Sequence, residues 1–122
     1  MIFTVDLPLC PSANNAFVNV PKRGRVPSAD HVAWKNTARR IVRDAWIAQG
    51  QPAITKPYAV YIAVNVNYRS DVANREKLCV DLIVATTDIP GDQWIDRIVI
   101  ERDRSVEGMR VEVMSLPTMV AL

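Results

Sequence analysis

Four short segments of the chain carry apolar residues in patterns typical of β-strands, and in the clearest of them apolar residues recur at every second position. The clearest is 58–67 (YAVYIAVNVN), in which every second residue is apolar. Residues 2–7, 95–102 and 109–114 predict three more strands. The tight turn at 106–108 is expected to join the last two strands into a hairpin.

Two longer segments repeat their apolar residues at helical spacing instead. A helix is predicted over 29–49, capped by Ser28 and ended by the Gly and Pro that follow. A second helix is expected over about 71–86, with Ser70 or Asp71 as its cap. The apolar face of the first helix consists of Trp34, Ala38, Ile41, Val42, Ala45 and Trp46.

Residues 8–27 contain four prolines, three asparagines and a glycine, which predicts a long loop. The resulting order is β-α-β-α-β-β, without an internal repeat. It predicts an α+β fold, a single two-layer domain in which two helices pack on a mixed sheet. We expect this domain to cover residues 1–116. A C-terminal tail, 117–122, is expected to be frayed or packed on a partner.

Size and composition are those of one ordinary globular domain. The chain has 122 residues, 49% hydrophobic and 23% charged, which excludes a disordered chain. No apolar run approaches the ~18 residues of a membrane span, and the first residues lack the basic start of a signal peptide. Cys10 and Cys79 have no CxxC spacing, so we expect a reduced, cytoplasmic protein without a zinc site.

Arginine dominates the positive charge. Fifteen basic residues against thirteen acidic ones give a net charge of only +2, but eleven of the fifteen are arginine. The guanidinium group is a planar fork that matches phosphate. The bases cluster around 22–25, 39–43, 69–77 and 97–104. Two interpretations remain open, a solvated surface with salt bridges or a nucleic-acid-binding surface.

Acidic residues beside bases carry the candidate chemistry. The single histidine, His31, is expected to have a structural or a surface role, and neither a GxGxxG motif nor a P-loop indicates a nucleotide cofactor. Residues 69–77 lie between a predicted strand and a predicted helix, where Asp71 taken alone is an N-cap candidate. Asp92 lies in the turn before the next strand. Two carboxylates with interleaved Arg and Lys are what a magnesium-dependent phosphodiesterase needs.

Four motifs, in order, resemble the RusA family of Holliday junction resolvases. They are Leu7-Pro8-Leu9-Cys10-Pro11-Ser12-Ala13-Asn14-Asn15 for the family's LPxxPSxNN, Arg23-Gly24-Arg25 before a Ser-led helix, Asp71-Val72-Ala73-Asn74-Arg75-Glu76-Lys77 with Asp81 for DxDNxxK, and Gly91-Asp92 for an acidic pair before a strand. The resemblance covers residues 2–114 and includes the same order of helices and strands.

The resemblance implies a structure-selective endonuclease that resolves four-way DNA junctions in recombination and repair. It implies Mg²⁺-dependent paired hydrolysis by a homodimer, without a membrane or a nucleotide cofactor. By motif position, Asp71 and Asp92 are the catalytic, metal-coordinating aspartates and Lys77 is the catalytic lysine. DNA contacts are expected from Lys22, Arg23, Arg25, Arg69, Asn74 and Arg75.

The chain departs from the family motif where Ala73 stands in place of the middle aspartate and Gly91 in place of the first acid of the pair. Three explanations are open for Ala73: a natural member that binds junctions with lost or weakened cleavage, an introduced substitution, or replacement by another carboxylate. Glu76 is the candidate replacement and third Mg²⁺ ligand, because it lies three residues further along the expected helix. Glu76 is otherwise a surface residue, and Lys77 is otherwise an i,i+4 partner of Asp81.

Two further interpretations stand beside the family. A single-strand or RNA-binding module would use the basic loops with Tyr58, Tyr61 and Tyr68, but Tyr58 and Tyr61 fall on opposite faces of the predicted strand. A small structural domain would carry the arginine excess as surface charge only. Magnesium-dependent cleavage and the salt dependence of DNA affinity distinguish these interpretations.

Overall fold

The structure is a computed structural model and describes residues 2–12 and 15–117. Its strands and helices are β1 (Ile2–Leu7), β2 (Phe17–Val20), β3 (Gly24–Pro27), α1 (Ala29–Ala48), β4 (Tyr58–Val64), α2 (Glu76–Thr86), β5 (Ile95–Arg102) and β6 (Met109–Ser115). Short 3₁₀ turns, η2 (Ala73–Arg75) and η3 (Asp92–Trp94), precede α2 and β5. The tail expected at 117–122 lies, apart from its first residue, outside the described residues.

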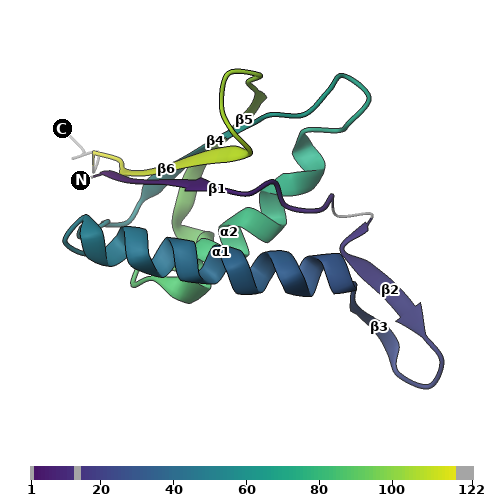
Figure 1. Ribbon diagram of the computed structural model, residues 1–122. Coiled ribbons are helices and arrows are strands. Elements are labelled where there is room, and N and C mark those ends of the chain that lie inside the picture. The colour runs from purple at the N-terminus through teal and green to yellow at the C-terminus, as the bar shows by residue number, and fades with distance from the viewer. Residues whose placement is uncertain (1, 13–14, 118–122) are drawn as a thin grey trace.

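Four strands form one mixed sheet in the order β1-β6-β4-β5. β4 is parallel to β5 and antiparallel to β6, and β6 is antiparallel to β1. Both helices lie on one side of this sheet (Figure 1). The α+β fold with two helices on a mixed sheet is therefore confirmed.

The core lies between this sheet and the two helices. The inward side chains of β1, β4 and β6 are buried at alternate positions, as the period of a strand requires. The α1 residues Trp34, Ala38, Val42 and Trp46 face them, and the Phe3 and Trp46 rings meet edge to face at 5.1 Å. The helical face predicted from sequence is thus the buried one.

Helix α1 begins as the sequence predicts. The Ser28 hydroxyl accepts a hydrogen bond from the His31 backbone N–H at 3.2 Å. His31 itself is buried, and its Nδ1 lies 3.1 Å from the Ala16 carbonyl oxygen. The predicted structural role of this histidine is confirmed.

The prediction of a long loop over 8–27 is wrong for residues 17–27. Residues 17–20 and 24–27 pair as the antiparallel hairpin β2–β3, which forms a separate two-stranded sheet. Arg23 N–H donates to the Val20 carbonyl at 3.1 Å, with Pro21 between them and Lys22 at φ 66°. This is the pattern of a type II turn, so the same residues that indicate a loop here connect two strands.

The prediction of a hairpin between the last two strands is also wrong. β5 and β6 are adjacent in sequence, but β4 lies between them and pairs with both. Parallel strands require a crossover connection, and α2 supplies it between β4 and β5. β6 then pairs with the other edge of β4, which is the most deeply buried strand.

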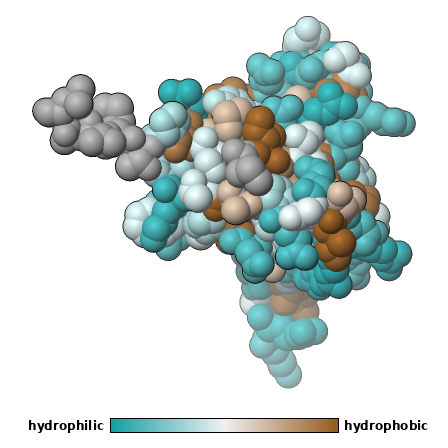
Figure 2. Space-filling view, turned by 90° about the vertical axis from the view of Figure 1, so that its left-hand side faces the viewer, coloured by the Kyte–Doolittle hydropathy of each residue, from teal (hydrophilic) through white to brown (hydrophobic). Residues whose placement is uncertain are grey.

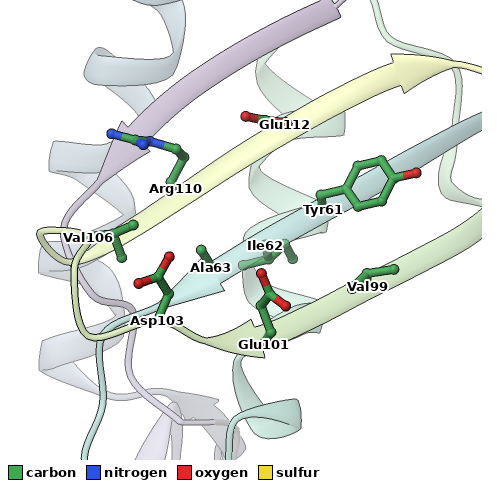
Figure 3. Close-up of a pocket in the computed structure, with 9 residues that line it drawn as sticks. All are labelled: Tyr61, Ile62, Ala63, Val99, Glu101, Asp103, Val106, Arg110 and Glu112. Carbon is green, nitrogen blue, oxygen red and sulfur yellow. The ribbon is translucent and has the colours of Figure 1, made fainter.

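Within residues 2–12 and 15–117, no helix lies on the second face of the sheet (Figure 3). A shallow cavity of about 320 Å³ lies on it, lined among others by Tyr61, Glu101, Asp103 and Glu112. Arg110 Nε, at one end of this face, donates to Asp6 at 2.9 Å. Figure 2 views the molecule from the side on which α1 ends, where apolar atoms form small separate patches in a mostly hydrophilic surface.

Gly108 lies in the β5–β6 connection, where this connection passes close to the backbone of β1. Its φ is 71°, and a Cβ there would collide with the Leu7 carbonyl oxygen. Gly108→Ala is expected to lower the free energy of unfolding by more than ~2 kcal/mol, since the strain of positive φ adds to a backbone clash. Urea unfolding measures this loss.

Gly50→Ala is the matched control, because Gly50 has φ 78° but nothing within 4 Å of an added Cβ. It should lose only ~1 kcal/mol, from the strain of positive φ alone. Equal losses in the two variants would contradict the packing described for Gly108.

Candidate functional site

Lys77, in the first turn of α2, lies close to two acidic side chains, those of Asp81 and Asp92. Its Nζ lies 3.2 Å from Asp81 Oδ1 and 3.7 Å from Asp92 Oδ2. The three side chains are more than half exposed, so these pairs add little stability. The hydrogen bond that Lys77 donates to Asp81 and the charge of Asp81, followed by the charges of Asp92 and Glu76, raise the pKa of Lys77. The structure thus brings Lys77 and Asp92 together, and it also forms the i,i+4 pair with Asp81.

Asp71 closes a short side-chain turn directly before η2 and is not the N-cap of α2. Its Oδ1 accepts from the Ala73 backbone N–H at 3.0 Å. The turn η2 follows, and α2 starts only at Glu76, with Arg75 as its N-cap residue. The prediction that the second helix begins near residue 71 is therefore wrong, because α2 begins at Glu76. The Asp71 side chain completes a local two-residue loop, which Asp forms readily in turns.

The carboxylates expected to hold Mg²⁺ do not form a metal site as they stand. In residues 2–12 and 15–117, no three His, Cys, Asp or Glu side chains are grouped so that they could bind an ion. Asp92 is paired with the Lys77 ammonium, and the exposed Ala73 side chain offers no oxygen. Asp71, Asp92 and Glu76 are thus not grouped as a three-residue site among the described residues, and we derive no hydrolytic step through Mg²⁺.

Tyr58 positions the turn that carries Asp92. Its hydroxyl donates to the Pro90 carbonyl at 2.6 Å and lies 3.3 Å from the Gly91 carbonyl oxygen. Burial, and then the negative charge of Asp92, raise the pKa of Tyr58 to about 12. The tyrosine is neutral at physiological pH and holds the residues before Asp92 against the start of β4.

Arg75 is committed to contacts inside the chain. Its Nη1 donates to the Cys10 carbonyl, and the Cys10 thiol lies 3.5 Å from the Arg75 carbonyl oxygen. Its Nε is buried without a hydrogen-bond partner among the described residues. These contacts fasten the segment after β1 to η2. Arg75 was expected to contact DNA, but the structure gives it this internal role.

Neither cysteine is a candidate nucleophile. Both are free and buried. Burial raises the pKa of Cys10 to about 11, although the Arg75 charge opposes the rise. Burial also raises the pKa of Cys79. The thiols therefore stay protonated, and the thiolate is the reactive form.

The other expected DNA-contacting residues lie in two exposed places. Lys22, Arg23 and Arg25 belong to the β2–β3 hairpin, and all three are exposed. Arg69 is exposed in the connection between β4 and α2, whereas Asn74 is half-buried in η2. In Figure 1 the hairpin and this connection both project at the end of the molecule opposite the chain termini.

Sequence reasoning missed the contact between Tyr68 and Arg102. Tyr68 is 82% exposed, and the Arg102 guanidinium lies 4.7 Å from its ring centroid. Arg102 Nη2 also donates to the Ser70 carbonyl at 3.0 Å. An aromatic residue directly before Arg69 in a polar loop is the only sequence signal for this pair. Tyr58 is in the core and Tyr61 on the open face, as the alternation predicts.

The chain matches no family model and no curated protein. In the described ranges, every helix is too short or too polar to cross a membrane.

Arg75→Ala is expected to lower the free energy of unfolding by ~1.5–3 kcal/mol, because a charged hydrogen bond is lost and the Cys10 carbonyl is left without its donor. Thermal or urea unfolding measures the change. Arg69→Ala removes the same charge from an exposed position and should change stability by less than ~0.5 kcal/mol. Similar losses in both variants would contradict the internal role of Arg75.

Tyr58→Phe is expected to cost ~1 kcal/mol at pH 8, since one hydrogen bond is lost. The pH dependence carries a second signature. An acid whose folded pKa is raised to about 12 loses its stabilising contribution as pH rises from about 10 to about 12. The difference in stability between wild type and Tyr58→Phe should therefore shrink over this range in urea unfolding. A difference that stays constant over this range would contradict the role of the buried Tyr58 hydroxyl.

Proposed function

We propose that this chain binds branched DNA, as a RusA-like protein whose acidic site is not assembled for cleavage. The observation that carries the proposal is a set of exposed cations on two projecting segments. None of them forms an ion pair within the described residues. They are Lys22, Arg23, Arg25 and Arg69.

Free cations of this kind are suited to phosphate. A protein that neutralises DNA phosphates releases condensed counterions, so unpaired Lys and Arg contribute most of the sequence-independent affinity. Three of the four are arginines, which bind phosphate through two parallel hydrogen bonds. Salt bridges to neighbouring acids would have supported the interpretation as a solvated surface, and these residues do not make them.

The preference for a junction rests on the resemblance to the RusA family. That resemblance includes the motifs at Arg23-Gly24-Arg25 and around Asp71 to Lys77. A homodimer would suit a four-way junction, because both have two-fold symmetry and each protomer would contact an equivalent part of the DNA.

A second candidate function is the junction cleavage that the family resemblance implies. It is favoured by the approach of Lys77 Nζ to Asp92 Oδ2 at 3.7 Å, which joins two of the three residues assigned to catalysis. Against it stands position 73, where an alanine methyl replaces the carboxylate next in the motif. We therefore place binding first and cleavage second.

The test uses a labelled four-way junction and a linear duplex made from the same arms, each with Mg²⁺ or EDTA. The wild-type chain is expected to bind the junction more tightly than the duplex and to leave both intact. Ala73→Asp should raise Mg²⁺-dependent nicking by at least ~100-fold, since even indirect partners of metal ligands change activity by ~10–100-fold. Adding Asp71→Asn to Ala73→Asp should remove the gain.

The controls separate the two functions. Mg²⁺-dependent paired nicking by the wild-type chain, abolished by Asp71→Asn, would overturn the binding-only proposal and make Glu76→Gln the next variant. Equal affinity for junction and duplex would contradict structure selectivity. Sedimentation of the protein–junction complex measures whether two chains bind each junction.

A further inference from the structure

The β2–β3 hairpin is an arm that stands away from the rest of the molecule. Figure 1 shows it projecting beyond the N-terminal end of α1, and the same arm extends below the body in Figure 2. Its two strands pair only with each other, from Phe17–Pro27 at the base to Val20–Gly24 at the tip. A lone two-stranded ribbon is marginally stable in water unless its base is supported.

The base of the arm is firmly held. Ser28 N–H donates to the Ala16 carbonyl at 2.8 Å, and the Ser28 hydroxyl donates to the Asn15 carbonyl at 2.9 Å. The Phe17 ring meets the buried His31 ring edge to face, with centroids 5.2 Å apart. These contacts set the direction of the arm, and residues 18, 19 and 21–25 are exposed.

The two faces of the arm differ in chemistry. Cross-strand partners share a face, so Asn19 and Arg25 lie together, next to Phe17. The Arg25 guanidinium lies 4.6 Å from the Phe17 ring centroid, on this same face. The other face carries Val18 and its partner Val26. One face thus carries the polar, positively charged pair Asn19–Arg25 beyond the apolar pair Phe17–Pro27 at its base, and the other face is apolar.

Charge on the arm has one sign only. Residues 15–28 contain three bases and no acid. Lys22 and Arg23 occupy the turn at the tip, where positive φ at Lys22 and Gly24 folds the chain back sharply. The tip therefore presents two cations in succession, and Arg25 adds a third on the polar face.

We propose that β2–β3 enters the major groove of duplex DNA, with Asn19 and Arg25 facing base edges and Lys22 and Arg23 on the phosphates at its rim. This rests on the proposed function, and it names the part of the DNA that the arm contacts. Arg and Asn are the side chains that pair best with guanine and adenine in that groove. The cations at the tip supply affinity that is independent of sequence.

The width of the ribbon selects the groove. Paired strands lie ~4.8 Å apart, and with side chains a ribbon is roughly as wide as a helix. The major groove of B-form DNA, ~12 Å wide, admits a two-stranded ribbon, whereas the minor groove is only ~6 Å wide. The major groove of an RNA duplex is too narrow and deep for side chains to read. The arm should therefore prefer DNA duplex to RNA duplex of the same sequence.

The first experiment compares two triple variants of equal charge. The arm variant lacks the three bases of the arm and combines Lys22→Ala, Arg23→Ala and Arg25→Ala. The α1 variant lacks three exposed bases of α1 and combines Arg39→Ala, Arg40→Ala and Arg43→Ala. The arm variant should bind the labelled junction roughly 100-fold more weakly, and its slope of log affinity against log salt should fall by about 2–3. The α1 variant should stay within about threefold of wild type, and matching unfolding midpoints would show that both fold.

The second experiment asks which groove is used. Methyl green, which occupies the major groove, should displace the wild-type chain from duplex DNA, and netropsin, which occupies the minor groove, should not. An RNA duplex of the same sequence should bind about as weakly as the arm variant binds DNA. Displacement by netropsin alone, or equal affinity for RNA and DNA, would overturn the assignment of the groove.

The two proposals fail in different ways. If the wild-type chain binds DNA and the arm variant binds equally well, the inference about the arm is wrong and DNA binding stands. If both triple variants lose the same affinity, net charge alone governs binding and the arm has no special role. Absence of DNA binding by the wild-type chain would overturn the proposed function, and the role of the arm with it.

Discussion

The fold depends on one strand, β4, which pairs with β5 along one edge and with β6 along the other. Because β4 and β5 run parallel, the chain between them must cross the sheet, and α2 is the crossover. That crossover brings Lys77, in its first turn, to within reach of Asp92 in the turn before β5. The hydrogen bonds of Tyr58, the first residue of β4, then hold that turn in place. The pairing of a single strand thus decides which charged residues meet.

The sequence was sufficient to predict those helices and strands whose buried residues recur at a regular spacing along the chain. The alternation in 58–67 predicts β4, and the helical spacing from Trp34 to Trp46 predicts α1, because each pattern reports one buried face. Strand order depends on pairing between distant segments, so the hairpin expected at 106–108 was wrong although both of its strands exist. The β2–β3 arm was hidden for another reason. Its prolines and glycine indicate loops in general, and the turn that they build is decided by φ at Lys22 and Gly24.

In the candidate site, too, some contacts could be predicted from the sequence and others could not. The contact between Lys77 and Asp92 agrees with the grouping that the motif resemblance implies, and the pair with Asp81 follows from helical spacing alone. The role of Arg75 could not be read from sequence, because its partner is the carbonyl of Cys10, 65 residues away. The start of α2 was misplaced because Asp71 accepts a hydrogen bond from the Ala73 N–H in a local turn, a contact that Asp makes in turns as readily as at a helix N-cap. Side chains that bind backbone groups at long range leave no periodic signal.

The Lys77 ammonium has a consequence for the acidic corner that it bridges. The ammonium is covalently attached to the chain, so its effective concentration near Asp81 and Asp92 does not depend on the composition of the solution. A chelator cannot withdraw it, and a dissolved cation that enters the corner must displace a group that never diffuses away. Because all three side chains are more than half exposed, solvent and salt screen this attached charge, so Lys77 offsets the charges of Asp81 and Asp92 only weakly and a dissolved cation competes with it directly.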